Sequence, residues 1–376
     1  MMTPKQKILF RIFDKAFKER ISIGLFGKYG IGKSSLVYEY ALMKSKELGR
    51  ELKVWHELNR DEKDEIMKNP EKYFVLVDIK GSMISLDNLI IPIPKGDKLV
   101  WETPEWMKLF SNERSSGILF IDELNMTVPT LQSILYELIF QRKLGEYSVR
   151  GNVLIITAGN DLESSEVAKE IPKPLINRML FINADELLID LDSWLEYAKS
   201  KEFDERIIGW VLFNDKHITY SKDSMEQSTT PRSLELLNKM IKGENDIDYI
   251  KLVAKSLLEK NDATQFISFI VLYEKLKDID KYINNVELID TLSNEERIII
   301  IMKISEKFVN DKIDIDKYYD FINRLSKKNK MLTAFALRYL KYQNTEKYKI
   351  IIDRIIKDGG NLYELIKGIL EFENAL

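Results

Sequence analysis

The sequence predicts an α/β fold in its first half and a helical fold in its second half. Four runs in the first half are of strand length and apolar almost throughout, at residues 21–27, 73–79, 117–122 and 152–158. Strands that are covered on both faces have this composition, and the helical segments between the runs favour a parallel, doubly wound sheet. After about Asp190 nearly every segment has helical periodicity, and no convincing strand follows.

Length and composition limit the classes of protein to which the chain can belong. A chain of 376 residues is expected to form two or three domains. A formal net charge of −3 gives no global basic field, so binding to nucleic acid would need a local patch. The absence of cysteine excludes disulfides, thiolate catalysis and cysteine-based zinc sites, and favours an intracellular protein. No apolar run has transmembrane length and the first residues lack a signal-type core, so we expect a cytoplasmic protein with no membrane partner.

The elements at the start of the chain can be assigned in order. Residues 3–20 predict an amphipathic helix in which Thr3 is the N-cap, Pro4 takes the first helical position and Gln6 completes a capping box. The apolar face of this helix is expected to consist of Ile8, Leu9, Ile12, Phe13, Ala16 and Phe17. The strand at 21–27 then leads into a glycine-rich loop, and a helix follows from Ser34 to about Leu48.

The glycine-rich loop, GKYGIGKS at residues 27–34, fits the pattern G-x-x-x-x-G-K-[ST]. Its glycines let backbone N–H groups turn toward phosphate oxygens, while Lys33 would reach the β- and γ-phosphates and Ser34 would bind Mg²⁺. The alternative is a glycine-rich turn with an unrelated lysine, but the strand before it and the helix after it favour a phosphate site. The expected nucleotide-binding residues of the loop are Gly27, Tyr29, Gly30, Ile31, Gly32, Lys33, Ser34 and Ser35.

Polar residues stand at the ends of two later strands. At the end of the third predicted strand, Asp122 would bind the nucleotide's Mg²⁺ together with Ser34, and Glu123 would act as the general base. At the end of the fourth, the amide of Asn160 would hydrogen-bond both the γ-phosphate and the attacking water. Strands often end in an acidic residue and GND is a common turn, so each signal gains its weight from the glycine-rich loop upstream.

Five motifs, taken in order, resemble those of a known family. The glycine-rich loop, GILFIDELN, ITAGND, IPKPLINRM and TTPRSLE resemble an AAA+ ATPase of the MoxR family, in the clade with an insert in its second helix. The resemblance extends over roughly residues 8–269. Residues 86–106 lie where this clade has its insert, with PKGD as a hairpin turn, and residues 140–152 resemble the hairpin before the third motif.

The resemblance implies a fold and a division into domains. It implies an α/β P-loop NTPase core of the AAA+ type, built on a parallel sheet, followed by an α-helical lid. The helical pattern, which divides near residue 275, adds an α-helical carboxyl-terminal region. The corresponding ranges are 1–189 for the nucleotide-binding core, 190–275 for the lid and 276–376 for the carboxyl-terminal extension. The resemblance does not reach this last range.

Two arginines match functional positions of the family and, with Glu123 and Asn160, complete the implied catalytic set. Arg178 in INRM matches the arginine finger, which enters the nucleotide site of a neighbouring subunit and is typically worth about 10³–10⁵ in rate. Arg232 in TTPRSLE matches the second sensor, in the first turn of a lid helix that Thr230 caps and Pro231 begins. The alternatives are a cation at a helix carboxyl terminus for Arg178 and an exposed first-turn arginine for Arg232. Rival trans-acting arginines are Arg114, Arg142 and Arg150.

The function that the resemblance implies is Mg²⁺-dependent ATP hydrolysis in a homo-oligomeric ring, expected to be a hexamer. Hydrolysis would remodel or activate a protein partner, and the implied partner class is a protein with a von Willebrand A domain. Two other functions stay open, a nucleic-acid motor of the same clade and a scaffold that binds ATP with negligible turnover. Salt-dependent binding of nucleic acid that stimulates hydrolysis would favour the motor, whereas the intact acid pair and arginines disfavour the scaffold.

The sequence also departs from the family's pattern. Lys28 and Tyr29 stand in the loop where the family often has small residues or proline, and Met126 stands where relatives often carry arginine. His56 and His217 have no metal-ligand spacing and are expected to have surface or packing roles.

Overall fold

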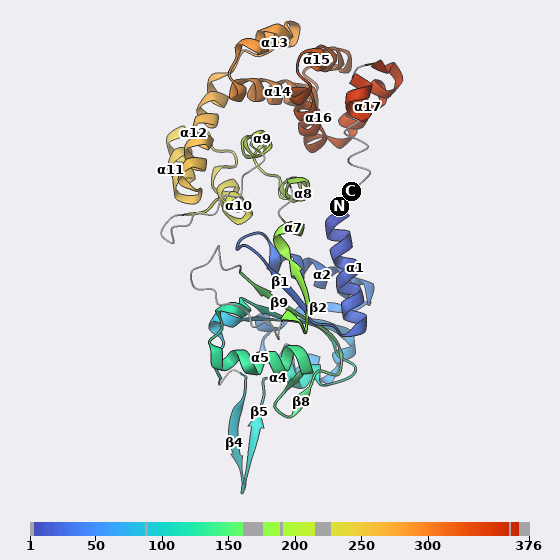
Figure 1. Cartoon of the computed structure of the whole chain (residues 1–376), viewed down its shortest axis with the longest axis vertical. Coiled ribbons are helices and arrows are strands. Elements are labelled where there is room, and N and C mark those ends of the chain that lie inside the picture. The colour runs from blue at the N-terminus through green and yellow to red at the C-terminus, as the bar shows by residue number, and fades with distance from the viewer. Residues whose placement is uncertain are drawn as a thin grey trace. The chain divides into compact units, whose positions relative to one another are not determined.

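The computed structural model describes residues 4–86, 89–160, 176–188, 191–214, 227–360 and 362–367. The chain forms two compact units, Met2–Asp190 and Leu191–Leu376 (Figure 1). The first contains a parallel sheet with helices and is called the α/β unit below. The second is built from helices and is called the helical unit.

The α/β unit is built on a six-stranded sheet with the order β10-β1-β9-β6-β3-β2, in which all neighbouring strands are parallel. The four predicted strands are confirmed as β1, β3, β6 and β9, whereas the two edge strands, β2 and β10, were not predicted. Because β9 lies between β1 and β6, strands that are far apart in the sequence are neighbours in the sheet. The strands are β1 (Ile23–Phe26), β2 (Glu51–Val54), β3 (Tyr73–Lys80), β6 (Ser116–Asp122), β9 (Asn152–Gly159) and β10 (Leu180–Asn183).

Helices cover both faces of this sheet. Alternate residues of the central strands, such as Leu76 and Val77 in β3, belong to two separate buried cores. One core includes α1 and α2 and the other includes α4 and α5, so the central strands are apolar on both sides. The helices of the unit are α1 (Pro4–Glu19), α2 (Lys33–Glu47), α3 (Arg60–Lys68), α4 (Glu105–Phe110), α5 (Pro129–Gln141) and α7 (Ala184–Leu188).

The first predicted helix is confirmed as α1, with one change in its buried face. It begins at Pro4, and Thr3 lies outside the described residues. Phe10 is 4% exposed whereas Ile8 is 51% exposed, so the predicted burial of Ile8 is wrong. The reason is an aromatic contact, because the ring of Phe10 meets Tyr40 of α2 edge-on with 5.4 Å between the ring centroids.

Two antiparallel hairpins complete the α/β unit. The first joins β4 (Ile91–Lys95) to β5 (Lys98–Glu102) and extends away from the sheet (Figure 1). Its turn contains Gly96 with a φ angle of 62°, which confirms the hairpin turn predicted at PKGD. The second joins β7 (Lys143–Leu144) to β8 (Tyr147–Ser148) and confirms the hairpin predicted within residues 140–152.

The helical unit has one continuous buried core, which extends from Trp194 to Ile366 and therefore crosses residue 275. A parallel α/β core followed by α-helices confirms the predicted fold class. Among the described residues, no helix is both long and apolar enough to cross a membrane. The helices are α8 (Leu191–Ser200), α9 (Glu205–Phe213), α10 (Pro231–Ile241), α11 (Ile247–Leu257), α12 (Lys260–Lys275), α13 (Asp280–Asn284), α14 (Asn294–Val309), α15 (Ile315–Lys328), α16 (Lys330–Gln343) and α17 (Thr345–Asp358).

Candidate functional site

The carboxyl ends of three neighbouring strands bring the predicted site residues together. The strands β1, β9 and β6 lie side by side and parallel, so the residues that follow them meet at one edge of the sheet. Gly27 follows β1, Asp122 ends β6 and Asn160 follows β9. Residues that are far apart in the sequence therefore form one cluster, which we call the sheet-edge site.

The glycine-rich loop needs its glycines for different reasons. Gly30 and Gly32 have φ angles of 73° and 99°, in the left-handed region that favours glycine. At Gly27 an added Cβ would lie 2.4 Å from Oδ1 of Asp185, so no side chain fits there. Gly32 is also the N-cap residue of α2, so the loop ends at the first turn of that helix, whose N–H groups have no acceptor within the helix. Of the other predicted loop residues, Tyr29 is half-buried, Ile31 is buried and Ser35 is exposed.

The side chain of Lys33 lies inside the loop and is only 7% exposed. Its Nζ donates hydrogen bonds to the carbonyl oxygens of Gly27 at 2.8 Å and Lys28 at 2.7 Å. It also donates to Oδ1 of Asn160 at 3.2 Å. Lys33 thus joins the loop to the end of β9, and a cation and an amide stand together where the sequence predicts phosphate groups.

Ser34 and Asp122, the two residues predicted to bind Mg²⁺, are in direct contact. The hydroxyl of Ser34 donates to Oδ2 of Asp122 at 2.8 Å, and both side chains are half-buried. The other oxygen, Oδ1, accepts a hydrogen bond from the backbone N–H of Glu123 at 2.9 Å. A hydroxyl and a carboxylate are ligands that suit Mg²⁺, which binds few protein oxygens and keeps several waters. The donor set therefore fits the ion that the sequence predicts.

A second carboxylate strengthens the negative potential at this edge. Asp78 in β3 accepts a hydrogen bond from the hydroxyl of Tyr38 at 3.0 Å. Burial raises the pKa of Asp78, and the charge of Asp122 raises it further. Among the described residues its Oδ1 is buried without a hydrogen-bond partner. A cation held by Ser34 and Asp122 would relieve this repulsion, and sequence reasoning missed Asp78 because it lies inside an ordinary strand.

Glu123 has a backbone conformation that is uncommon for a residue with a side chain. Its φ and ψ angles are 55° and 38°, in the left-handed region, where strain is typical of functional sites. Its carboxylate accepts a hydrogen bond from the hydroxyl of Ser82. An added Cβ on Gly81 would lie 2.6 Å from the carbonyl oxygen of Glu123, so this glycine allows the close approach. Gly81 and Ser82 orient Glu123, and no motif marks them in the sequence.

Asn125 is a further positioning residue that the sequence motifs did not single out. It is 3% exposed, and its side-chain amide both donates a hydrogen bond to and accepts one from the main chain of Asn160. Its Nδ2 donates to the carbonyl oxygen of Asn160 at 2.6 Å, and the N–H of Asn160 donates to its Oδ1 at 3.1 Å. The only signal in the sequence was its place two residues after the acid pair.

Arg178 lies away from the sheet-edge site of its own chain. It precedes Leu180, which pairs with Ile23 at the start of β1, so a strand length of about 10 Å separates it from the loop. The side chain is exposed, and its guanidinium lies over the ring of Phe140 at 4.5 Å from the centroid. Arg178 is therefore exposed and distant from its own loop, and a contact with another subunit stays a prediction.

The three rival arginines differ in how free their side chains are to contact a neighbouring subunit. Arg142 donates to the carbonyl oxygens of Val153 and Arg20, and burial, followed by the charge of Arg20, lowers its pKa to about 10. Because Arg142 is committed within its own unit, it is the weakest candidate for a contact in trans. Arg114 pairs with Glu71 at 3.2 Å, and both Arg114 and Arg150 are exposed.

Arg232 belongs to the helical unit, in the exposed first turn of α10. Thr230 is the N-cap of this helix and Pro231 takes the first helical position, as predicted. The side chain of Thr230 accepts from the N–H of Ser233 at 3.2 Å, which fixes the turn that carries Arg232. A contact between Arg232 and a nucleotide stays a prediction.

The histidines behave as ordinary residues where they are described. His56 is 53% exposed, and His217 lies outside the described residues. Within the described part of the chain, no group of three or more histidine, aspartate and glutamate residues could hold a metal ion.

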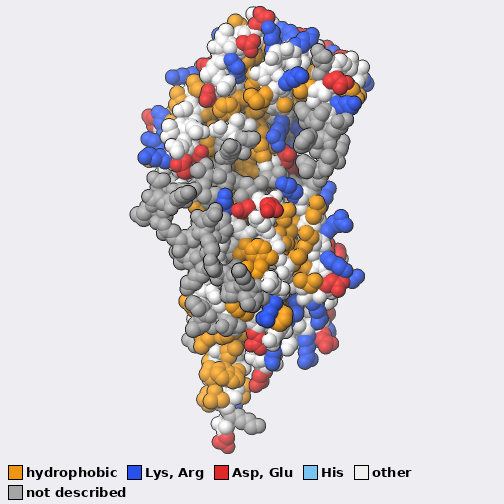
Figure 2. Space-filling model, viewed as in Figure 1, with side chains coloured by type: hydrophobic (Ala, Val, Ile, Leu, Met, Phe, Trp, Pro, Cys, Tyr) orange, Lys and Arg blue, Asp and Glu red, His pale blue; other side chains and the backbone are white. Residues whose placement is uncertain are grey.

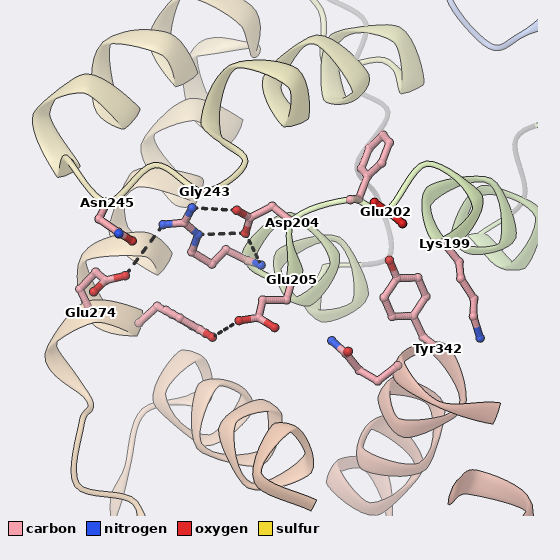
Figure 3. Close-up of a pocket in the computed structure, with 12 residues that line it drawn as sticks. Lys199, Glu202, Asp204, Glu205, Gly243, Asn245, Glu274 and Tyr342 are labelled. Carbon is pink, nitrogen blue, oxygen red and sulfur yellow. Dashed lines mark hydrogen bonds and ion pairs between the residues drawn. The ribbon is translucent and has the colours of Figure 1, made fainter. Parts of the chain in front are cut away.

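The helical unit contains a cavity of about 550 Å³, lined by α8, α9, α12 and α16 (Figure 3). Asp204 and Arg206 form a bidentate ion pair in its wall, with bonds of 2.9 and 2.7 Å. Arg206 also donates to the carbonyl oxygens of Ile241 at 3.2 Å and Glu244 at 2.9 Å. The charges of Asp204 and Arg206 are thus paired and hydrogen-bonded within the helical unit.

A carboxyl–tyrosine cluster adjoins this cavity and consists of Glu205, Tyr273, Glu306 and Tyr339. The hydroxyl of Tyr273 lies 3.1 Å from Glu205 and 3.2 Å from Glu306, and Tyr339 donates to Glu306 at 2.9 Å. Burial and then the charge of Glu205 raise the pKa of Glu306 to about 7, although both tyrosines and Lys303 oppose this shift. Sequence reasoning missed the cluster, because its members are scattered over four helices.

Comparisons with known proteins add solved structures of low similarity. No protein-family model and no curated protein matches the chain. Similar structures include a RuvB mutant from Thermotoga maritima, at 14% identity and TM-score 0.36, covering 86% of this chain and 79% of that one. NtrX from Brucella abortus has 13% identity and TM-score 0.40, covering 92% and 69%. A DNA replication initiation factor has 13% identity and TM-score 0.34, covering 97% and 95%. At these scores the likenesses identify neither a family nor an activity.

Proposed function

We propose that this chain is an AAA+ ATPase whose α/β unit binds ATP and Mg²⁺ and hydrolyses the bond to the γ-phosphoryl group. The contact between Ser34 and Asp122, at 2.8 Å, carries the proposal, because it joins two motifs that are 88 residues apart. Lys33 and Asn160 meet beside it. A phosphate-binding loop, an acid pair and a polar strand end are the parts that phosphoryl transfer needs.

Each residue of the sheet-edge site has a role that follows from its chemistry. The loop N–H groups and Lys33 would bind the phosphates of ATP, and Ser34 and Asp122 would hold the metal ion. Bound Mg²⁺ neutralises charge on the phosphate oxygens. Glu123 would accept the proton of the attacking water as its oxygen bonds to the γ-phosphorus, the bond from that phosphorus to the bridging oxygen breaks and ADP leaves. Asn160 would orient the water.

Hydrolysis of ATP by the purified chain tests this proposal. We expect Mg²⁺-dependent release of phosphate from the wild type, and a loss of about 10²-fold or more in kcat/KM for Lys33→Ala. Lys46→Ala is a matched control, because it removes an exposed lysine from the same helix and should change neither rate nor affinity. A wild-type chain that neither binds nor hydrolyses ATP would falsify the proposal, as would full activity in Lys33→Ala.

We also propose a homo-oligomeric ring, expected to be a hexamer, in which Arg178 completes the nucleotide site of a neighbouring subunit. The exposure of Arg178, and the strand length between it and its own loop, support this role. Arg178→Ala should lower turnover by about 10³-fold or more. Mixing it with Glu123→Gln subunits should restore part of the activity, because an intact Glu123 then faces an intact arginine. Mixtures as inactive as either variant alone would contradict a contact in trans.

The partner that we propose is a protein, and the resemblance implies the von Willebrand A domain class. One face of the β4–β5 hairpin is formed by two cross-strand pairs, Pro92 with Trp101 and Pro94 with Leu99. All four side chains are exposed, Leu99 by 65%, and Figure 2 shows apolar side chains over this hairpin. The prolines lack the N–H groups that a strand added along β4 would need, so a partner would contact the apolar face through side chains.

An affinity capture tests this partner class. The variant Glu123→Gln, held in ATP, should retain a protein that mass spectrometry identifies. Adding Leu99→Ser and Trp101→Ser to the same variant should release that protein while leaving ATP binding unchanged. Retention of nucleic acid instead, weakening steeply with salt, would favour the motor function.

A further inference from the structure

The chain leaves the α/β unit through α7, and the first turn of this helix touches the glycine-rich loop. Oδ1 of Asp185 accepts a hydrogen bond from the backbone N–H of Lys28 at 2.8 Å. The approach is close, because an added Cβ on Gly27 would lie 2.4 Å from this oxygen and 3.1 Å from the backbone nitrogen of Asp185. The absence of a side chain at Gly27 is therefore what allows the contact.

The position of Asp185 is set by the sheet. Asn183 ends β10 and pairs in register with Phe26, which ends β1 just before the loop. Oδ1 of Asn183 accepts from the N–H of Asp185 at 3.1 Å, and its Nδ2 donates to Glu186 at 3.0 Å. These bonds fix the first turn of α7 on the strand beside β1, so Asp185 reaches the loop from a rigid support.

Lys28 is held from two sides. Asp185 binds its N–H group, while its carbonyl oxygen accepts a hydrogen bond from Nζ of Lys33 at 2.7 Å. A displacement of α7 would thus act on the loop segment that also binds Lys33. Because α7 ends at Leu188 and the helical unit begins at Leu191, this contact stands at the start of the connection between the units.

We propose that Asp185 is a positioning residue that ties the nucleotide-binding loop to α7 and so couples the nucleotide state to the connection between the two units. The inference rests on the proposed function, since it assigns a role in that same site. Coupling of this kind is reciprocal, so nucleotide binding should in turn stabilise α7.

The first experiment needs no nucleotide and compares amide hydrogen exchange in the full chain. Asp185→Ala should speed exchange of the Lys28 amide by about tenfold, because one hydrogen bond to a carboxylate is lost. Asp185→Asn keeps a side-chain oxygen that accepts the same bond, so its exchange should stay near that of the wild type. Equal exchange in all three proteins would overturn the proposed contact.

The second experiment measures the affinity for a fluorescent ATP analogue and the kinetics of hydrolysis. Asp185→Ala should raise Kd and KM by about fivefold to tenfold with kcat changed by less than about twofold, whereas Asp185→Asn should bind like the wild type. Gly27→Ala should also weaken binding, and its effect should shrink when Asp185→Ala provides room for the new methyl group. Glu113→Gln, an exposed acidic residue of the same unit that lies outside α7 and the loop, is the control and should change neither constant.

The third experiment tests the coupling itself. Adding the ATP analogue should slow amide exchange in α7 of the wild type and of Asp185→Asn, but not of Asp185→Ala at saturating analogue. Protection of α7 that is the same in all three proteins would overturn the coupling. If the wild type binds no nucleotide, the proposed function fails, while the nucleotide-free exchange still decides whether Asp185 holds the loop. If Asp185→Ala does not fold, Gly27→Ala against Asp185→Asn tests the same contact.

Discussion

The two units gather the same kinds of side chain in two different ways. At the sheet-edge site, the polar groups belong to one loop and to the ends of neighbouring strands. In the carboxyl–tyrosine cluster, they come from four helices, α9, α12, α14 and α16, and contact chiefly one another. The first arrangement faces outward from a sheet edge, and the second is enclosed by helix packing.

A count of protons shows that the hydrogen bonds of the carboxyl–tyrosine cluster can all be satisfied by its own four side chains once one carboxyl is protonated. Tyr273 has one hydroxyl proton but lies within hydrogen-bond distance of both Glu205 and Glu306. One hydroxyl cannot donate to two carboxylates, so the cluster needs a second proton. With that proton on Glu306, its carboxyl donates to Tyr273, which donates to Glu205, and each short contact is satisfied.

The sheet-edge site is not complete in this sense. The oxygens of Ser34 and Asp122 retain capacity for a metal ion, and a strained Glu123 stands beside them. A large cavity and raised carboxyl pKa values are often used to locate active sites. Here the cavity and the raised pKa of Glu306 occur together in the helical unit, beside groups that satisfy one another. The sheet-edge site has the raised pKa of Asp78 and, beside it, ligands that remain open. In this chain, side chains that can still bind a ligand locate the candidate active site better than a cavity or a raised carboxyl pKa does.

The largest expected effect comes from making the same substitution in both units. Glu123→Gln should lower kcat by about 10²–10⁴-fold, as the loss of a general base does, with ATP still bound. Glu306→Gln should leave kcat within about twofold, because its carboxyl contacts only residues of the helical unit. Steady-state phosphate release and nucleotide binding measure both. A loss of turnover in Glu306→Gln comparable to that in Glu123→Gln would remove the distinction drawn between the units.

A smaller effect concerns the stability of the helical unit as the pH changes. The pKa of Glu306 is raised from 4.5 to about 7, first by burial and then by the charge of Glu205. Its proton therefore stabilises the folded state fully below about pH 4.5, and this contribution is lost as the pH rises through about 7. The loss should be on the order of 3 kcal/mol in the free energy of unfolding.

Glu306→Gln isolates this contribution, because glutamine keeps a donor toward Tyr273 and cannot titrate. Thermal unfolding of both proteins between pH 5 and pH 8 should show the wild type losing stability relative to the variant as the pH rises. Lys303, the cation over the ring of Tyr273, has a pKa that burial lowers; because it is present in both proteins, its titration cancels in their difference. Parallel curves for the two proteins would show that Glu306 does not titrate in this window.

Much of the α/β unit could be predicted because its signals are local. Strands that are covered on both faces are continuously apolar, so β1, β3, β6 and β9 were found from composition alone. The edge strands β2 and β10 are as short as β1, but β1 is buried throughout whereas most residues of β2 and β10 are exposed or half-buried, so their composition gives no strand signal. The residues that meet at the sheet edge could be predicted to lie together because each ends or directly follows a strand or belongs to the loop, where spacing fixes position.

The residues that sequence reasoning missed act through contacts that no local pattern records. Asp185 touches a loop 157 residues away, and Asn125 meets Asn160 only because β6 and β9 are neighbours. The bond between Tyr273 and Glu205 spans 68 residues and joins two helices whose own patterns show only burial. Such contacts follow from the order of elements in space, which periodicity does not determine.

The smallest expected effect tests whether the helical unit contributes to the nucleotide site at all. Thr230 caps α10, whose first turn carries Arg232, and Ser293 caps α14 with the same capping-box geometry. Removing either hydroxyl, in Thr230→Ala or Ser293→Ala, should lower the free energy of unfolding by about 1 kcal/mol. If Arg232 contacts the γ-phosphate, only Thr230→Ala should also raise the KM for ATP, because only that cap orients the arginine. Thr230→Ser keeps the hydroxyl and should restore both properties. Equal KM values in the two alanine variants would confine nucleotide binding to the α/β unit, and would make the division between the units sharper than the resemblance implies.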